Sequence, residues 1–224
     1  MHLEEAIRSR KSVRRFLPKK VPRDVIEAML ELAARAPSGN NIQPWIVHVV
    51  TGQVKQAISK DILDAIKTES DQHQAEYDYY PEEWFEPYQA RRRAVGFELF
   101  EQLGIARADR EAREQQTLRN FEFFDAPVAL FISLDRRLSL GSYVDLGMFI
   151  QNLLLVARAH DLHTCAQAAF APFHRIVRHH IPLADEHLLV CAISLGFEDL
   201  DAPENKLITP REEVPGFAGF YGFE

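Results

Sequence analysis

Apolar residues recur along the chain at two spacings, one typical of helices and one typical of strands. Apolar side chains three or four residues apart predict helices, and short β-branched or apolar runs predict buried strands. The predicted helices are residues 2–8, 22–35, 51–66, 142–160 and 172–179. The predicted strands are residues 45–50 (WIVHVV), 127–134 (PVALFISL) and 187–195 (HLLVCAISL). Strands separated by helices predict an α/β arrangement of two or three layers, and periodicity alone leaves the strand direction open.

Two segments depart from this pattern. Residues 67–122 are polar and aromatic, with predicted helices at 82–103 and 109–121, and we interpret them as a helical excursion rather than a second domain. Residues 202–224 are rich in Pro and Gly yet end in several phenylalanines. Such an apolar extension must bury itself on its own domain or on a partner chain. We therefore expect residues 1–224 to form one domain with these two additions.

Charge is concentrated near the start of the chain. The sequence has 26 Lys and Arg against 33 Asp and Glu, a formal net charge of −7, yet residues 8–23 hold eight basic residues and no acidic one. A short basic island on an acidic protein is typical of a local anion site, although a solvated basic loop is an alternative on charge alone. A nucleic-acid interface would normally need a broader basic face, so no nucleic-acid partner is expected.

The composition narrows the class of protein further. Hydrophobic residues make up 46% and charged residues 26% of the chain, which excludes a wholly disordered protein. No apolar run approaches the ~20 residues of a membrane-spanning helix, and residues 1–5 show no basic stretch leading into an apolar one, so neither a secretory signal nor a membrane partner is expected. Two cysteines form no disulfide framework, which favours a cytoplasmic setting. The nine histidines show no metal-ligand spacing, so no metal is expected.

A basic motif stands inside the island, at Arg10-Lys11-Ser12-Val13-Arg14. In an extended segment, residues two apart share a face. Arg10, Ser12 and Arg14 would then point the same way, with Val13 opposite. Two guanidinium groups and a hydroxyl on one face suit a phosphate, which accepts several charge-assisted hydrogen bonds.

A second motif, APSGNNIQPW at residues 36–45, lies between a predicted helix and a predicted strand. Its small residues let backbone N–H groups approach a planar or anionic ligand closely. Asn41 and Gln43 could hydrogen-bond the amide-like edge of a heterocycle. The alternative is an ordinary loop with Asn at left-handed positions.

Taken together, these two motifs resemble the nitroreductase family of flavoproteins. The agreement continues at DLG (145–147), TCAQAAF (164–170), SLGF (194–197) and the segment from Asn205 to Glu213. The length, the excursion and the Phe-rich tail are most similar to the branch that reduces nitrobenzoates and related nitroaromatics.

The resemblance implies a fold, a cofactor and a reaction. The fold is α+β, a mostly antiparallel central sheet flanked by helices, in a homodimer with exchanged C-terminal tails and FMN at the subunit interface. NADH or NADPH would be a transient hydride donor, because the chain has no G-x-G-x-x-G motif. The implied reaction is ping-pong hydride transfer that takes a nitro group to nitroso and then to hydroxylamine. The chemistry belongs to FMN, with no catalytic side chain.

The resemblance also implies which positions contact FMN. Arg10 and Ser12 match phosphate and ribityl contacts, Arg14 matches the residue that tunes the pyrimidine end of the flavin, and Arg211 matches a late phosphate ligand. The full set is Arg10, Lys11, Ser12, Arg14, Pro37, Ser38, Gly39, Asn41, Gln167, Ala168, Ala169 and Arg211. The loop at 37–41 would reach the flavin of the other subunit, and the turn at 168–169 would face flavin N5. Two positions depart from the family: this turn has alanines where Gly or Glu is frequent, and Thr209 replaces a second phosphate-binding lysine.

Several readings stay open. The aromatic cluster Tyr77–Tyr88 is either a lid over the flavin or the hydrophobic side of the excursion, and as a lid it would take aromatic substrates, with Arg119 favouring acidic ones. Cys165 is either a small apolar filler or a redox thiol. The same fold also serves quinone or flavin reduction and reductive dehalogenation. A flavin-binding regulatory module without turnover is the alternative from another class.

Overall fold

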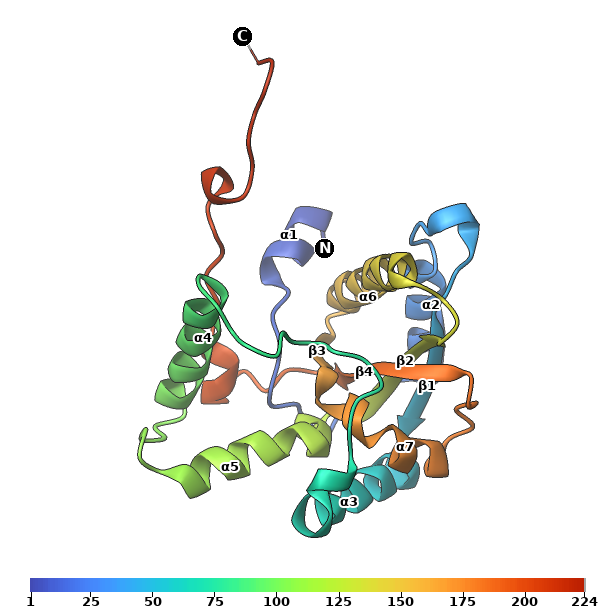
Figure 1. Ribbon diagram of the computed structural model, residues 1–224, viewed down its shortest axis with the longest axis vertical. Helices are drawn as coiled ribbons and strands as arrows, with labels where there is room; N and C mark the ends of the chain where they lie inside the picture. Colours follow the sequence, from blue (N-terminus) through green and yellow to red (C-terminus); the bar gives the residue numbers. More distant parts are fainter. Residues whose placement is uncertain (224) are drawn as a thin grey trace.

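A single antiparallel sheet positions every other element of the molecule. The computed structural model describes residues 1–223, and in that range the sheet has four strands in the order β1-β2-β4-β3, with each neighbouring pair antiparallel (Figure 1). The strands are β1 (Ile46–Thr51), β2 (Val128–Asp135), β3 (His163–Gln167) and β4 (His187–Gly196). The strand directions that periodicity left open are therefore settled, and the expected α+β fold is confirmed.

Helices cover both faces of this sheet. The helices are α1 (Leu3–Ser9), α2 (Arg23–Ala33), α3 (Gly52–Thr68), α4 (Tyr88–Gln102), α5 (Arg110–Leu118), α6 (Leu140–Ala159) and α7 (His174–His180). Helices α2 and α6 pack on one face, and α3 and α7 pack on the other (Figure 1). The result is a three-layer core, one of the two arrangements that the helix and strand pattern predicts.

Strand β2 shows why this core needs two helical layers. Leu130 and Ile132 point into the cluster under α2 and α6, whereas Ala129 and Phe131 point into the cluster under α3 and α7. All four side chains are fully buried. A strand buried on both faces reads as a continuous apolar run in the sequence, which is why the run at 127–134 predicts it so clearly.

Strand β3 is an element that the hydrophobic pattern did not predict, since the one expectation for this region was the turn at 168–169 that the family resemblance implies. The strand is short, with the sequence HTCAQ, and lacks the apolar run of the other strands. It lies at the edge of the sheet, where its outer side meets the N-terminal segment through a bridge between Ser12 and Thr164. Covering an edge strand in this way satisfies backbone groups that would otherwise be left for another chain.

The excursion has two helices, but their expected bounds were wrong. The helix expected at 82–103 begins only at Tyr88, because Pro87 immediately before it has no N–H to donate and restricts the preceding residue to extended backbone. The helix expected at 109–121 ends at Leu118 and continues as 3₁₀ turns at Arg119–Asp125, in which Phe123 and Phe124 adopt left-handed backbone. Both helices project to one side of the sheet (Figure 1).

The polypeptide that leads into these helices is tied to the core at Tyr77. Its hydroxyl donates a hydrogen bond of 2.6 Å to the carbonyl of Val190 on β4. The register between β2 and β4 shifts at this point, so that Val190 is paired with no residue of β2. The preceding Glu76 pairs with Arg136 at 2.8 Å. The start of the excursion is therefore held against β4, even though α4 has no buried residue of its own.

The C-terminal tail extends away from the rest of the chain (Figure 1). Phe217, Phe220, Tyr221 and Phe223 are each between 67% and 89% exposed. So many exposed aromatic rings on one segment are typical of a surface that another chain covers.

Helix α6 is long and apolar enough to cross a membrane by length and composition alone, which the search for apolar runs did not anticipate. In the fold it lies on the sheet, where Leu146, Phe149 and Leu153 are almost completely buried. The central helix of a three-layer core has the same composition, and that is how we interpret α6.

Candidate functional site

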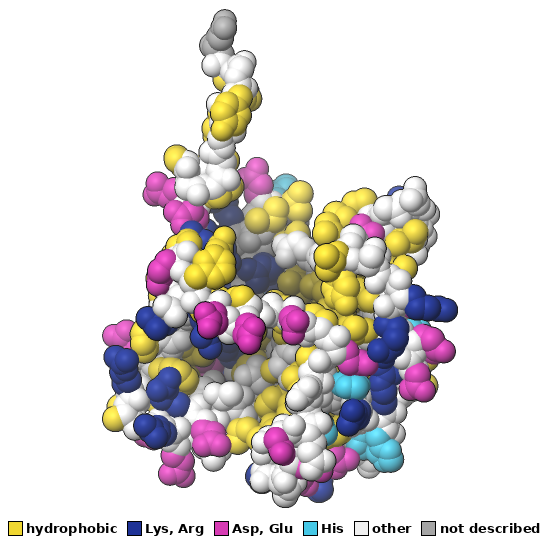
Figure 2. Space-filling view, viewed as in Figure 1, with side chains coloured by type: hydrophobic (Ala, Val, Ile, Leu, Met, Phe, Trp, Pro, Cys, Tyr) yellow, Lys and Arg dark blue, Asp and Glu magenta, His cyan; other side chains and the backbone are white. Residues whose placement is uncertain are grey.

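A cavity of about 890 Å³ lies between the N-terminal segment, α6 and the C-terminal segment. Figure 2 shows the surface hollowed between α1 and α6, with Lys and Arg side chains inside the hollow. The cationic residues in its lining are Arg8, Arg10, Lys11, Arg14, Arg158 and Arg211, and His163 and Glu198 line it as well. Half of the basic island, Arg8, Arg10, Lys11 and Arg14, thus lines a concave surface, whereas Lys19, Lys20 and Arg23 are exposed outside it.

Alternation along residues 10–15 separates the basic side chains into two groups. On the inner side, Lys11 pairs with Glu198 at 2.7 Å, Val13 is fully buried and Arg15 pairs with Glu204 at 3.1 Å. The other side brings together Arg10, Ser12 and Arg14 in the cavity lining. Lys11 also borders the cavity, but its ammonium group is already engaged. The charges of the inner side are therefore neutralised within the protein, while those of the outer side face the cavity.

Asn205 holds this segment in place and was not singled out as a site residue from the sequence. Its Oδ1 accepts from the Arg14 N–H at 2.7 Å, and its Nδ2 donates to the carbonyls of Arg15 at 2.8 Å and Asp199 at 2.9 Å. The backbone carbonyl of Asn205 accepts from Lys11 Nζ at 2.6 Å. The side chain is buried, at 2% exposed, so its hydrogen bonds have little competition from water. The sole signal for it in the sequence is the match at 205–206 to the family's closing segment.

Arg10 and Arg211 face the same cavity without a carboxylate between them. Within residues 1–223, no Asp or Glu oxygen lies within 4.0 Å of either guanidinium group. Burial and then the positive charge of Arg211 lower the pKa of Arg10. A partly buried guanidinium group beside a second, exposed one forms a site to which a dianion such as a phosphate would bind favourably.

Thr209, the departure from the family's lysine, contributes to this arrangement. Arg211 Nη1 donates to Thr209 Oγ1 at 2.8 Å and to the carbonyls of Thr209 and Pro210. The threonine therefore orients Arg211 rather than supplying a charge of its own.

Two further residues of the lining were missed as site residues. Arg158 is held by Ser9 Oγ at 3.2 Å and by the carbonyl of Leu162 at 3.0 Å, so its guanidinium group is fixed at the cavity wall. His163 Nε2 lies 3.0 Å from Glu198. Burial, followed by the nearby charges of Arg158 and Lys11, lowers the pKa of His163 to about 4, so the ring is neutral near pH 7.

The turn at Gln167–Ala169 lines a second cavity, of about 530 Å³. Ala168 and Ala169 line it together with Tyr79 and Tyr80 of the aromatic cluster. Trp84 and Phe85 are not in that lining as described for residues 1–223. The structure thus places the first part of the aromatic cluster, and not the second, beside the turn.

The side chain of Gln167 is occupied by the protein itself. Its Nε2 donates to the carbonyl of Asn120 at 2.7 Å, and its Oε1 accepts from Ser194 Oγ at 2.5 Å. Both ends of the amide are satisfied in a residue that is 3% exposed. Any contact that Gln167 makes with a ligand would therefore come from its backbone.

Cys165 lies directly behind the basic segment, on β3. The side chain is 5% exposed, and burial raises the pKa of its thiol. A buried, protonated thiol is a weak nucleophile, which favours the interpretation of Cys165 as an apolar filler.

The loop at residues 37–41 lies outside the linings of both cavities, as described for residues 1–223. Gly39, Asn40 and Asn41 are exposed. Asn40, Asn41 and Gln43 have φ angles of 50°, 58° and 49°, so Asn indeed occupies left-handed positions here. In a single chain the loop cannot take part in the site formed by Arg10 and Arg211.

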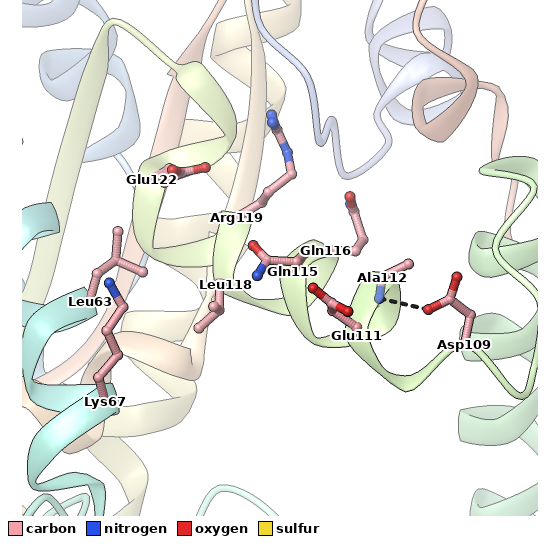
Figure 3. Close-up of a pocket in the computed structure, with 10 residues that line it drawn as sticks. All are labelled: Leu63, Lys67, Asp109, Glu111, Ala112, Gln115, Gln116, Leu118, Arg119 and Glu122. Atoms are coloured by element: carbon pink, nitrogen blue, oxygen red, sulfur yellow. Dashed lines mark hydrogen bonds between the residues drawn. The ribbon is translucent and has the colours of Figure 1, made fainter.

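A further cavity, of about 760 Å³, lies between α3 and α5 (Figure 3). Its lining holds both basic and acidic side chains, so neither sign of charge is concentrated there. Lys67, Asp109, Glu111 and Glu122 come from separate turns of its wall, and Arg119 points away from them (Figure 3). Arg119 pairs with Asp125 at 2.8 Å, so its charge is already matched. Within residues 1–223, no group of three or more His, Cys, Asp and Glu is placed to hold a metal ion.

Comparison with known proteins extends the picture over the whole chain. Residues 7–197 match the sequence profile of the nitroreductase family. A protein named 4-nitrobenzoate reductase from Nocardioides sp. (strain LMS-CY) is 42% identical over 211 residues, 93% of this chain and 85% of its own. The nitrobenzene nitroreductase of Ectopseudomonas oleovorans is 34% identical over 218 residues, 97% of this chain and 96% of its own. The crystal structure of the FMN and NADPH-dependent nitroreductase NfnB from Sphigopyxis sp. strain HMH matches with a TM-score of 0.96 and 35% identity, covering 100% of both chains.

The Asn205 network yields a stability prediction. Asn205→Ala removes one buried acceptor and two buried donors, so the free energy of unfolding should fall by about 2–4 kcal/mol. Urea denaturation followed by circular dichroism measures this loss. Thr117→Ala is the control, because its side chain makes one exposed hydrogen bond, to the carbonyl of Arg113 at 2.9 Å, and it should cost under about 1 kcal/mol. Equal losses in the two variants would contradict the role given to Asn205.

Proposed function

The chain belongs to the nitroreductase family, and we propose that it is an FMN-dependent oxidoreductase that reduces nitroaromatic compounds with NAD(P)H. The observation that carries the proposal is the pair of unmatched guanidinium groups, Arg10 and Arg211, in one cavity. A phosphate-bearing cofactor fits there because it brings the negative charge that the protein leaves out. The names of the relatives supply the substrate class and the hydride donor.

Each residue that the family match implies then has a defined task. Arg10, Ser12 and Arg211 would hold the FMN phosphate and the adjoining ribityl chain. Arg14 would lie beside the pyrimidine end of the ring, where negative charge accumulates on reduction, and would stabilise that charge. FMN, when bound, supplies the hydride chemistry, accepting from NAD(P)H and donating to the nitro compound.

The second cavity would form the substrate face. Ala168 and Ala169 border it with small side chains, which leaves their backbone N–H groups accessible to a flavin edge. Tyr79 and Tyr80, in mutual edge contact at 4.6 Å between ring centroids, would form its aromatic wall. A planar nitroarene gains from offset stacking on such rings. The nicotinamide and the nitroarene would occupy this face in turn, which gives ping-pong kinetics.

We also propose that the working unit is a homodimer. The loop at 37–41 reaches neither cavity of its own chain, so a second copy would have to bring it to the flavin. The tail exposes Phe217, Tyr221 and Phe223, and α6 exposes Leu140 and Val144, at 66% or more. These apolar surfaces are suited to a partner chain on which the tails exchange. The two buried cysteines are free thiols, which fits the proposed cytoplasmic setting.

Turnover tests the proposed function most simply. The purified protein should carry a flavin whose visible absorbance is bleached by NADPH or NADH without oxygen. Addition of 4-nitrobenzoate should restore the absorbance, and steady-state assays should show parallel lines typical of ping-pong kinetics. A flavin that NAD(P)H bleaches but no nitroarene or quinone reoxidises would contradict a reductase and favour a flavin-binding regulatory module. Reoxidation by quinones alone would favour the quinone reductase alternative.

Replacement of the phosphate arginines should weaken FMN binding. Arg10→Ala and Arg211→Ala each remove charge-assisted hydrogen bonds, which corresponds to a loss of about ten- to a hundredfold in affinity. Dilution of the flavin-loaded protein, followed by free-flavin fluorescence, measures the change. Arg23→Ala removes the same charge from the fully exposed start of α2 and should leave FMN affinity unchanged. Unchanged affinity in both test variants would remove the phosphate assignment.

The dimer should be obligate for flavin binding. Removal of the tail from residue 214 onward should shift the sedimentation coefficient toward the monomer and release FMN in parallel. The expectation follows from the number of exposed rings on the tail and from the separation of the 37–41 loop from both cavities. A stable monomer of 25.7 kDa that retains its FMN would contradict it.

The aromatic wall should control the choice among nitroarenes. Tyr79→Leu and Tyr80→Leu remove rings that border the second cavity, so the kcat/KM order of nitrobenzoate, nitrobenzene and a quinone should change while FMN stays bound. Phe85→Leu is the matched control, since Phe85 is 59% exposed and packs on Tyr88 outside that cavity. An unchanged order in the tyrosine variants, or loss of FMN, would show that these rings belong to the core and not to the substrate face.

A further inference from the structure

A carboxylate is buried on the inner side of α6, where most of the buried residues are apolar. Asp145 is 8% exposed and lies beside Leu146 and Phe149, which are each 1% exposed. Within residues 1–223, no Lys, Arg or His nitrogen lies within 4.0 Å of it, and its Oδ2 accepts a hydrogen bond of 3.1 Å from the backbone N–H of Gly39. A buried carboxylate without a neighbouring cation is unfavourable. We therefore look to its hydrogen-bond partner, Gly39, for the role of Asp145.

That partner belongs to the loop at 37–41, and α6 contacts the polypeptide on both sides of the loop as well. Phe149 stacks on Trp45, with ring centroids 5.0 Å apart and 11° between the planes. Asn152 Nδ2 donates to the carbonyl of Ala33 at 3.4 Å. The three α6 residues lie four and then three positions apart, so they form one stripe along the helix. This stripe holds the end of α2, the middle of the loop and the entry to β1.

The conformation that the stripe holds is an unfavourable one. Asn40, Asn41 and Gln43 all have left-handed backbone, and Gln43 is a residue that rarely adopts it. Within the loop, Ser38 Oγ accepts from the Gln43 N–H at 3.0 Å. Strained backbone persists only where its surroundings determine it, and such segments concentrate at ligand sites. The hydrogen bond from the Gly39 N–H to Asp145 joins the centre of the loop to a polar side chain of the core.

We propose that Asp145 is a positioning residue that holds the 37–41 loop in the conformation in which it contacts the flavin of the other subunit. The inference rests on the proposed function for the identity of the ligand. Because the loop is exposed and strained, loss of the Asp145 acceptor would let it relax. Ordering the loop would then have to occur on flavin binding, and that cost would lower the affinity. Asp145 touches neither cavity, so its effect is carried entirely by the loop.

The test uses the full-length, flavin-loaded protein and two independent readouts. Amide hydrogen exchange at Gly39 and Asn41 reports the order of the loop, and FMN release on dilution reports its contact with the flavin. Asp145→Leu removes the acceptor with a side chain of similar size that suits the apolar inner face of α6, and Asp145→Ala is the second variant. Asp145→Asn keeps an oxygen that can accept from the Gly39 N–H. Ser142→Ala is the matched control, as it changes another buried polar residue of α6.

We expect Asp145→Leu and Asp145→Ala to speed Gly39 exchange and to weaken FMN retention, each by about tenfold or more, the effect of losing one hydrogen bond to a charged group. Asp145→Asn and Ser142→Ala should stay close to the parent protein in both readouts. Slow Gly39 exchange in the leucine variant, or fast exchange with unchanged FMN retention, would overturn the inference. Weaker FMN retention in Ser142→Ala to the same extent would also overturn it, because the effect would then belong to α6 as a whole. If the parent protein binds no FMN, the proposed function fails, whereas the exchange rates still decide whether Asp145 orders the loop.

Discussion

The alternation of side chains along residues 10–15 is the constraint on which the rest of the site depends. Lys11 and Arg15 turn inward to Glu198 and Glu204, and Arg10 and Arg14 turn outward to the cavity. A shift of one residue would turn Arg10 and Arg14 toward the buried carboxylates and Val13 toward the cavity, so the two guanidinium groups and the Ser12 hydroxyl would no longer share the cavity face. The same short segment therefore neutralises part of its own charge and keeps the remainder for an anionic ligand. We regard this division as the physical basis of FMN binding by the chain.

The division is maintained by parts of the chain that are far apart in sequence. The N-terminal segment lies along the edge strand β3, and the Val13 N–H donates to the carbonyl of Thr164 at 3.0 Å. On its other side, Asn205 sets the register from nearly two hundred residues away. Both neighbours depend on the antiparallel sheet, because β3 pairs with β4 and the chain leaves β4 toward Asn205. Sheet, chain termini and cavity thus form one connected arrangement.

Much of this could be predicted from the sequence, for physical reasons. Dense apolar runs predict strand β2 and helix α6. Because alternate residues of an extended segment share a face, the sequence also places Arg10, Ser12 and Arg14 together. Strand β3 could not be predicted in the same way, since five small or polar residues at a sheet edge carry no hydrophobic pattern. Long-range partners such as Asn205 and Asp145 carry no signal in the hydrophobic pattern, because a single polar residue acquires its role only from what the fold places beside it. The FMN contacts themselves were implied by family resemblance and remain predictions.

The contribution of the FMN phosphate to binding tests the central claim most directly. Competition between riboflavin and bound FMN isolates that contribution, because the two ligands differ only in the phosphate. The account predicts that the parent protein prefers FMN by about a hundredfold or more, as two charge-assisted contacts would give, and that the Arg10→Ala, Arg211→Ala double variant loses most of this preference. Equal affinity of the parent protein for riboflavin and FMN, or a preference that survives in the double variant, would contradict the account.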